Sequence, residues 1–543
     1  MFMKVHQAIA KALFANEVET VFGLMGDANM FMIDSYIRDC GGTFVPAANE
    51  AGAMLMALGY ALASGKPGIC SVTHGPALTN TLTGLIEGVR GRVPAVLICG
   101  DTPQSNREHL QDVAQREIAL VAGAGFEQLR SPATVGEDVA RSLARAVRER
   151  RPIMLNVPVE FDWEDAGEFE PVRAYIPERR ALVSESVDID NAVGIIAAAR
   201  RPLIVAGRGA VSSSARAALI RLAGRTGAPL ATTLKAKDLF EGDAFNLGIC
   251  GTLSTAGATE TLMEADCLIA FGASLNKYTT AHGGILRGKR VIQVNLEVEE
   301  VGKNISVDAG LVGDPAQVAD LLHHWLDEAE IPSSEWRGQE ILERIAQDRG
   351  ISPPRLDDGD GAVDFVGVLE KLEEALPRDR VLVTDSGRFM LEVFKRIRVP
   401  DPQSLIVTHN FGSIGLGLSH AIGACFGARG RPVVAVCGDG GFMNGGLAEF
   451  NTAVRTNADL IVIVMNDGVY GAEHYKFTQK QMDWSNIGYD WPDFAKVAIS
   501  LGGEGLTLAG ERDWPAVAAA IEQRPRPLLI DVKINPDKVL SEF

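Results

Sequence analysis

Two stretches of this 543-residue chain, one near each end, repeat the same order of sequence patterns. The first runs from EAGAMLMALGYALAS through GKPGICSVTHGPALTN to VPAVLICGDTP, and the second from IGLGLSHAIGACFGA through GRPVVAVCGDGGFMNGG to ADLIVIVMND. Each is typical of a helix, a Gly-Lys/Arg-Pro step, a strand, a glycine turn, a helix and a strand. The spacing from Pro67 to Val96 also equals that from Pro432 to Ile461. We therefore predict two copies of one βαβ architecture.

Strand-like apolar runs alternate with helical patterns along the rest of the chain, which predicts α/β layers built on parallel sheets. Residues 164–185 and 331–362 interrupt this alternation with charged, proline-containing sequence, and we interpret them as linkers. The predicted fold is three doubly wound parallel-sheet domains over residues 1–165, 186–330 and 360–543. The outer two are expected to be homologous and the central one Rossmann-like.

Composition and charge narrow the classes of partner. The net charge of −18, from 52 Lys and Arg against 70 Asp and Glu, argues against nucleic acid or an anionic membrane as a partner. The seven cysteines follow no pairing pattern, which indicates a reducing compartment. The N-terminus lacks a continuous apolar signal region, and no apolar run approaches the length of a membrane span. We expect a cytoplasmic protein.

An aspartate, Asp439, lies in the glycine cluster after the strand VVAVCG, where glycines usually make room for phosphate. The third glycine of the dinucleotide motif falls on Met443, and no Gly-Lys-Ser/Thr follows, so neither common nucleotide motif fits. The next strand ends in Asn466, and parallel strands open on one edge of a sheet. Carboxylate, amide and carbonyl oxygens suit Mg²⁺, which would reconcile the acid with a diphosphate. The alternative is an ordinary turn aspartate.

The pair GDGGF and VMND resembles the magnesium–diphosphate motif of thiamine diphosphate (ThDP) enzymes. Nearly the whole chain resembles the acetolactate synthase and pyruvate decarboxylase superfamily, and in particular the synthase large subunits. This resemblance implies a pyrimidine-binding, a central and a diphosphate-binding domain, with active sites between the subunits of a homodimer or homotetramer. It implies that Asp439, Asn466 and the Gly468 carbonyl hold the metal. The further cofactor contacts that it implies are Gly387, Arg388, Gly412, Gly438, Gly440, Gly441, Val469 and Tyr470.

Two more residues are assigned to the cofactor by the same resemblance. The segment PAANEAGAMLMALGYALASGKPG places Glu50 where the family uses a glutamate to hydrogen-bond the pyrimidine N1′. A glutamate among Ala, Gly and Met must find a partner or stay exposed. The segment FGSIGLGLSHAIGA places Ile414 where a bulky aliphatic side chain bends the cofactor. The alternatives are a solvated glutamate at a helix start and a plain core isoleucine.

Some residues resemble those of synthases, and others resemble those of decarboxylases. HLQDVAQ resembles a synthase segment and places Gln111 in the site, whereas FGLMGDANMFMIDSY and YGAEHYKF resemble decarboxylases and contribute Asp27 and Glu473. His74, in THGPALTN, stands where synthases carry SGPGATN, and His109 stands alone where pyruvate decarboxylases have paired histidines. The implied substrates are a 2-oxo acid and a carbonyl acceptor. Transfer to that acceptor is favoured; simple decarboxylation to an aldehyde, or a non-catalytic role, are the alternatives.

The sequence of the central domain indicates whether a third cofactor, FAD, is expected. Its segment RPLIVAGRGAVSSSARAALIRLA matches the dinucleotide motif only in part. Acetolactate synthases carry FAD in this domain with the segment GARFDDR, which is GASLNKY here at residues 272–278 and lacks both arginines. The expected cofactors are therefore ThDP and Mg²⁺, and FAD is doubtful.

Overall fold

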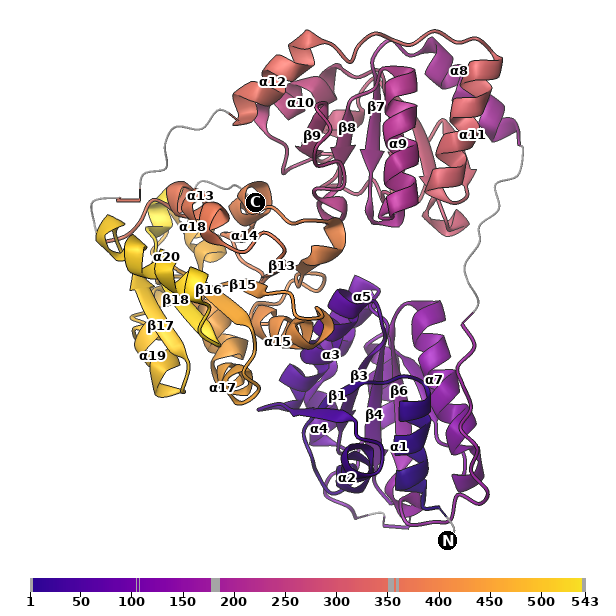
Figure 1. Ribbon diagram of the computed structural model, residues 1–543, viewed down its shortest axis with the longest axis vertical. Coiled ribbons are helices and arrows are strands. Elements are labelled where there is room, and N and C mark those ends of the chain that lie inside the picture. Colours follow the sequence, from indigo (N-terminus) through magenta and orange to yellow (C-terminus); the bar gives the residue numbers. More distant parts are fainter. Residues whose placement is uncertain are drawn as a thin grey trace. The chain divides into compact units, whose positions relative to one another are not determined.

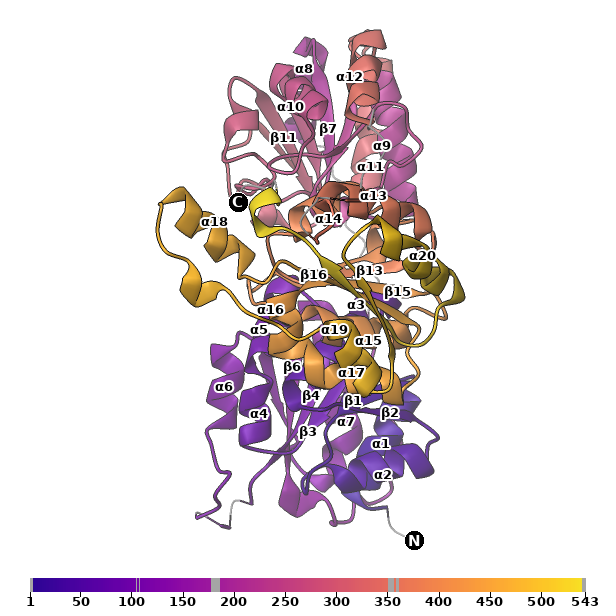
Figure 2. The same cartoon turned by 90° about the vertical axis from the view of Figure 1, so that its left-hand side faces the viewer.

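Three six-stranded parallel sheets flanked by helices make up the protein (Figures 1 and 2), which confirms the predicted α/β class. The computed structural model describes residues 3–103, 105–106, 108–176, 186–349, 356–357 and 361–539. Two compact units result. One contains Met1–Pro177, Arg355–Met390 and Ile406–Phe543, and the other contains Glu178–Pro354 and Leu391–Leu405. Among the described helices, none is both long and apolar enough to cross a membrane.

The N-terminal sheet has the strand order β2-β1-β3-β4-β6-β5. Its strands are β1 (Thr20–Gly23), β2 (Thr43–Pro46), β3 (Gly68–Val72), β4 (Ala95–Asp101), β5 (Gly125–Gln128) and β6 (Pro152–Pro158). Its helices are α1 (Val5–Ala15), α2 (Met30–Arg38), α3 (Glu50–Ser64), α4 (Pro76–Asn80), α5 (Leu82–Gly91), α6 (Gln115–Val121) and α7 (Val135–Glu149). The central strands β3, β4 and β6 are almost wholly buried, as expected for a sheet covered on both faces.

The C-terminal sheet repeats this order as β14-β13-β15-β16-β18-β17, which agrees with the predicted duplication. Its strands are β13 (Val381–Thr384), β14 (Leu405–Val407), β15 (Val433–Gly438), β16 (Leu460–Asn466), β17 (Glu504–Leu508) and β18 (Leu528–Lys533). The helices in this part of the chain are α13 (Phe365–Ala375), α14 (Met390–Arg396), α15 (Gly417–Gly427), α16 (Asp439–Gly441), α17 (Leu447–Arg455), α18 (Gly471–Gln479), α19 (Phe494–Ser500) and α20 (Trp514–Gln523).

Helices α3 and α15 join these two sheets through one shared hydrophobic core. Gly59 of α3 lies against the backbone carbonyl of His420, and Gly423 of α15 lies against that of Met56; a Cβ at either glycine would collide with the facing helix. The small-residue sequences of both helices therefore allow the backbones to approach closely. The first and third sheets form one compact unit for this reason.

The central sheet has the order β12-β11-β10-β7-β8-β9. Its strands are β7 (Pro202–Ala206), β8 (Leu230–Thr232), β9 (Asn246–Ile249), β10 (Cys267–Phe271), β11 (Arg290–Asn295) and β12 (Ala309–Val312). Its helices are α8 (Val187–Ala198), α9 (Ser213–Thr226), α10 (Ala256–Glu264), α11 (Pro315–Glu328) and α12 (Gln339–Arg349). The topological switch point, where doubly wound folds usually bind ligands, lies between β7 and β10.

Helix α12 lies inside residues 331–362, which the sequence predicted to be a linker. Its side chains Ile341 and Ile345, one turn apart, are buried in the core of the central unit, and α12 packs on α10. That prediction was wrong for α12 because two apolar positions suffice to dock a helix whose other faces are charged. The predicted linkers otherwise fall partly outside the described residues.

Candidate functional site

Asp439 lies where the edge of the C-terminal sheet opens, at the end of β15. It begins an unbroken helical run through α16, a π-helical turn at Phe442–Gly446 and α17. Its carboxylate is buried and accepts the N–H of Gly440 at 2.7 Å and the N–H of Gly468, after β16, at 2.8 Å. The structure therefore brings Asp439 and Gly468 together from neighbouring strands. The first N–H groups of such a helical run attract anions.

Asn466 is the last residue of β16, and the nitrogen of its side-chain amide is engaged in a hydrogen bond. Its Nδ2 donates a 2.9 Å hydrogen bond to Asp531 on β18, which is fully buried. Asp531 also accepts the N–H of Phe494 at 3.0 Å and pairs with Lys533 at 2.8 Å. With its nitrogen engaged, Asn466 has its Oδ1 left as the atom to offer a cation. Asp531 was not among the predicted residues, although a charged residue within the apolar run LLIDVKI was a visible signal.

Electrostatics at this edge fit a divalent cation. Burial raises the pKa of Asp439 to about 6. Burial, and then the charge of Asp439, raise the pKa of the adjacent Asp467 to about 8. Two carboxyl groups therefore lie next to each other here, of which Asp439 is buried, and oxygen ligands of this kind stabilise a hard cation.

Glycines line the approach to Asp439. A Cβ on Gly440 would collide with the ring of Tyr470, and one on Gly441 would meet the carboxylate of Asp385, so both positions require glycine. Tyr470 in turn lies edge-on to Tyr489, with ring centroids 5.1 Å apart. Gly438 leads into this turn, and Val469 beyond it is buried. The two glycines therefore let the Tyr470 ring and the Asp385 carboxylate pack directly against the backbone of this turn.

The loop that carries Ile414 is held by Asp385, at the end of β13. This buried carboxylate accepts the N–H groups of Gly415 at 2.8 Å and Leu416 at 3.2 Å. Burial raises the pKa of Asp385 to about 6. Gly412 and Gly415 both have left-handed backbones, with φ of 82° and 83°. Asp385 was not among the predicted residues, although it stands in the same strand end, VLVTDSGRFM, that indicated its neighbours.

Gly387 and Arg388 follow Asp385 in that strand end. The Arg388 guanidinium is buried, donates to the carbonyls of Pro536 (3.2 Å) and Val539, and lies 4.8 Å from the ring centroid of Tyr475. Gly387 lies against the ring of Phe389. In the described chain, Arg388 therefore contacts the C-terminal segment.

Asp27, His74 and Gln111 come together on the N-terminal sheet. Thr73 donates to the Asp27 carboxylate at 2.8 Å, and this bond is the main reason that the pKa of Asp27 is lowered. His74 is 1% exposed, with Nε2 3.7 Å from Asp27 and with no hydrogen-bond partner for Nδ1 among the described residues. Its ring lies edge-on to that of His109 at 5.1 Å. His109, which stands alone in the sequence, therefore has a partner in space.

Gln111 is folded against the turn after β3. Its backbone carbonyl lies so close to Gly75, which has a φ of 58°, that a Cβ there would collide with it. Its own N–H donates to Nδ1 of His109 at 3.2 Å. The loop with His109 and Gln111 thus lies beside His74.

Glu50 is the first residue of α3, which Asn49 caps by accepting the N–H of Gly52 at 2.8 Å. The Glu50 carboxylate is partly buried and accepts a 2.9 Å hydrogen bond from Asn80 of α4. The glutamate among small apolar residues therefore has the polar partner that its position demands.

Glu473 projects from α18 with its side chain 51% exposed, 4.0 Å from Lys476 on the same helix. It belongs to the C-terminal sheet, whereas Asp27 and His74 belong to the N-terminal one, and no described hydrogen bond or ion pair joins them. The neighbouring His474 is buried and 3.5 Å from Asp537, and burial lowers its pKa.

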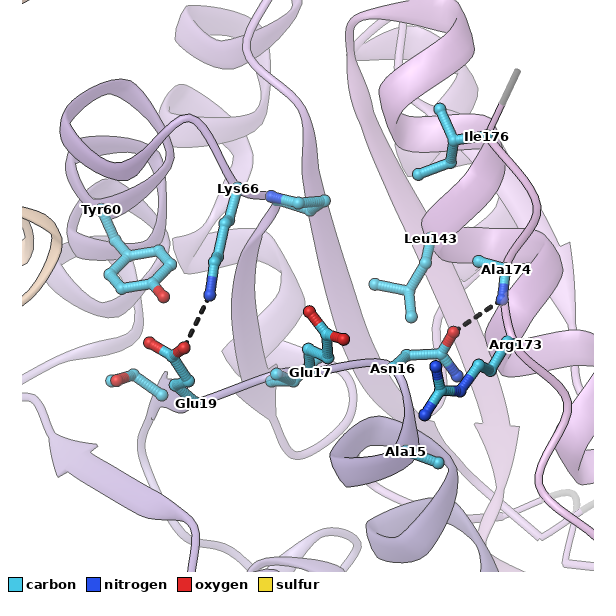
Figure 3. A pocket seen from close by; sticks show the side chains of 13 residues that line it. Ala15, Asn16, Glu17, Glu19, Tyr60, Lys66, Leu143, Arg173, Ala174 and Ile176 are labelled. Atoms are coloured by element: carbon cyan, nitrogen blue, oxygen red, sulfur yellow. Dashed lines mark hydrogen bonds and ion pairs between the residues drawn. The ribbon is translucent and has the colours of Figure 1, made fainter. Parts of the chain in front are cut away.

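A pocket of about 330 Å³ opens elsewhere on the N-terminal domain (Figure 3). It includes Asn16, Glu17, Glu19 and Lys66, and the Lys66 ammonium pairs with Glu19 at 2.6 Å. None of the predicted site residues lines it, and its charges of both signs suggest no ligand class.

Comparison with known proteins extends over nearly the whole chain. Models of the thiamine pyrophosphate enzyme N-terminal TPP binding domain, central domain and C-terminal TPP binding domain match residues 3–122, 189–322 and 385–532. A probable acetolactate synthase large subunit of Methanocaldococcus jannaschii is 27% identical, covering 99% of this chain and 93% of that protein. The acetolactate synthase large subunit of Parasynechococcus marenigrum is 28% identical, covering 97% and 87%. The acetolactate synthase isozyme 2 large subunit of Escherichia coli is 26% identical, covering 97% and 95%.

Proposed function

Because the chain belongs to the thiamine pyrophosphate (thiamine diphosphate) enzyme family, we propose that it decarboxylates a 2-oxo acid and transfers the remaining acyl group to a second carbonyl compound. The product would be an acetohydroxy acid or an acyloin. The observation that carries this proposal is the similarity to acetolactate synthases along nearly the whole length of the chain.

The proposed cofactors are ThDP and Mg²⁺. When bound, ThDP would supply a nucleophilic carbon for the 2-oxo acid carbonyl and an acceptor for the electron pair that remains when CO₂ leaves. Asp439, the Oδ1 of Asn466 and the carbonyl of Gly468 would hold Mg²⁺, which suits oxygen ligands and diphosphate. The helical run from Asp439 would direct its first N–H groups at the diphosphate.

Two residues would act on the organic part of the cofactor. Glu50 would hydrogen-bond the pyrimidine N1′, with Asn80 holding the second carboxylate oxygen. Ile414 would hold the cofactor bent, because Asp385 anchors the Gly415 end of its loop. Gly387, Arg388, Gly412 and Val469 are proposed as further contacts on the strength of the family resemblance alone.

The N-terminal cluster is proposed to handle the substrate. The imidazole of His74, with its Nε2 3.7 Å from the Asp27 carboxylate, is proposed as the group that exchanges a proton with the substrate. His109 and Gln111 border the same place and would bind the substrate's carboxylate or carbonyl. Glu473 is proposed to join this cluster from another subunit, with active sites between the subunits of a homodimer or homotetramer.

One observation favours the second candidate, a decarboxylase that releases an aldehyde. Two histidines beside a carboxylate form a proton-delivery group, and protonation is the step that ends simple decarboxylation. Incubation with ThDP, Mg²⁺ and a panel of 2-oxo acids, with and without aldehyde or ketone acceptors, separates the two. Acyloin or 2-hydroxy-2-methyl-3-oxo acid products support the carboligase; aldehyde and CO₂ alone would overturn it.

FAD is left out of the proposed cofactor set. At the switch point of the central sheet, the N–H of Gly209 donates to the carbonyl of Gly272 at 3.0 Å, and a Cβ on Gly207 would strike the same carbonyl. The two glycine turns thus contact each other where a dinucleotide usually lies. A purified protein without a flavin absorption band would agree with this. A cytoplasmic location stays a prediction from composition.

A further inference from the structure

Two buried glutamates remain without a role in the proposed chemistry. Glu87 on α5 is 1% exposed and Glu449 on α17 is 0% exposed. Glu87, in the N-terminal domain, accepts hydrogen bonds from backbone N–H groups of the C-terminal domain, and Glu449, in the C-terminal domain, accepts them from the N-terminal domain. Burying a carboxylate is costly unless hydrogen bonds replace its water, so both contacts must be specific.

Glu449 holds the segment that leads into α3. Its carboxylate accepts the N–H of Ala48, 3.1 Å from each oxygen, and the N–H of Asn49 at 3.1 Å. Thr452, one turn along α17, donates to it at 2.7 Å. The next residue of the chain after Asn49 is Glu50. Because α17 continues the helical run that begins at Asp439, one run connects Asp439 with the Glu50 segment.

Glu87 holds the loop that leads to Ile414. It accepts the N–H of Phe411 at 2.7 Å, and both the N–H (3.2 Å) and the side-chain amide (2.5 Å) of Asn410. Asp385 holds the same loop at its other end through Gly415. Two buried carboxylates, one from each domain, therefore fix both ends of the short segment that carries Ile414.

The two contacts are copies of one arrangement. The sequence distance from Glu87 to Glu449 equals that from Ala48 to Asn410 and from Asn49 to Phe411. In each half of the duplicated chain, a glutamate on the helix after the glycine turn reaches the segment that precedes the small-residue helix of the other half. The two contacts thus form a reciprocal pair between the two halves that α3 and α15 join.

We propose that Glu449 and Glu87 are positioning residues for thiamine diphosphate. Glu449 fixes the direction in which α3 presents Glu50 to the pyrimidine, and Glu87 fixes the loop that presents Ile414. This inference rests on the proposed function of Glu50 and Ile414. The two residues have different expected effects. Loss of Glu449 weakens recognition of the pyrimidine N1′, whereas loss of Glu87 weakens cofactor binding as a whole.

The test measures binding rather than turnover. Titration calorimetry with Mg²⁺ gives the Kd of ThDP and of an analogue in which carbon replaces the pyrimidine N1′, and their ratio reports the Glu50 contact. Wild-type protein should prefer ThDP by on the order of tenfold, the scale of a hydrogen bond to a charged group. Glu50→Ala should abolish the preference, because alanine has no polar group to offer N1′. Glu449→Gln should reduce the ratio toward one. Glu87→Gln should weaken both ligands and leave the ratio intact.

Asp138→Asn is the matched control, because Asp138 is equally buried but holds Arg130 and Thr134 within its own domain. It should lower the melting temperature without changing the ratio. If Glu449→Gln does not fold, Thr452→Val, which removes one support of Glu449, should shift the ratio in the same direction. An unchanged ratio in the folded Glu449 or Thr452 variant, or a Glu87 variant with wild-type affinities, would overturn the inference. Failure of wild-type protein to bind ThDP would instead defeat the proposed function.

Discussion

The Nδ2 of Asn466 donates a 2.9 Å hydrogen bond to the buried carboxylate of Asp531, one strand away in the C-terminal sheet. A side-chain amide can offer either its oxygen or its nitrogen, and this bond determines that the oxygen is the free atom. Asp531, which is not itself a proposed metal ligand, thus determines whether the oxygen of Asn466 is free to bind a cation.

Replacement of Asp531 by Asn should therefore weaken Mg²⁺ binding. Loss of a group that orients a metal ligand typically costs about 10–100-fold in metal affinity, so the Mg²⁺ concentration that half-saturates ThDP binding should rise by that factor. Asp493→Asn is the control, since Asp493 caps α19 in the same domain. An Asp531 variant that folds and keeps the wild-type Mg²⁺ requirement would contradict the assigned role.

Glu50→Gln should retain the fold and lose turnover on the order of 10²-fold or more, the scale of acid–base assistance. If active sites lie between subunits, mixing inactive Glu50→Gln and Asp439→Ala proteins and allowing exchange should restore part of the activity, because one hybrid site keeps both residues. Near-normal turnover of Glu50→Gln would defeat the assignment, and absence of complementation after proven exchange would defeat the shared site.

His74→Gln should lower turnover on the order of 10²-fold while leaving ThDP affinity unchanged, because the imidazole lies beside Asp27 and His109 rather than beside Asp439. His6→Gln is a suitable control: His6 is also a buried histidine of the N-terminal domain, and it bonds Ser35 at 2.9 Å. Equal turnover of the two variants would indicate that His74 is structural.

A fourth prediction concerns stability and Asp162. Burial raises the pKa of Asp162 from 3.8 to about 7. Between these values the folded protein binds the proton more strongly than the unfolded chain, so Asp162 lowers the free energy of unfolding as the pH rises, by at most about 1.4 kcal/mol per pH unit. Asp162→Asn, which stays neutral, should be more stable than wild type at pH about 8 and similar at pH about 4. Parallel pH profiles in urea denaturation would contradict this.

Much of the fold was predictable because its signals are local. The Gly-Lys/Arg-Pro steps and the glycine turns placed the duplicated units, and the two outer sheets do share one strand order. Helix α12 escaped prediction because only Ile341 and Ile345 mark its buried face.

The site was predictable where a motif is continuous, as at Asp439. Asp385, Asp531 and Glu449 were missed, since each acts on a segment that only sheet neighbours or domain packing bring close. The pairing of His74 with His109 was missed for the same reason: they meet only because the Gln111 loop folds back on the turn after β3.

The most direct test of the central claim is a calorimetric titration of ThDP with and without Mg²⁺, on wild-type protein and on Asp439→Ala. We expect binding by the wild type that depends on Mg²⁺ and is lost in the variant, because Asp439 is the carboxylate among the proposed metal ligands. Equal binding by both proteins, with no effect of Mg²⁺, would contradict a metal–diphosphate site at the edge formed by Asp439 and Asn466.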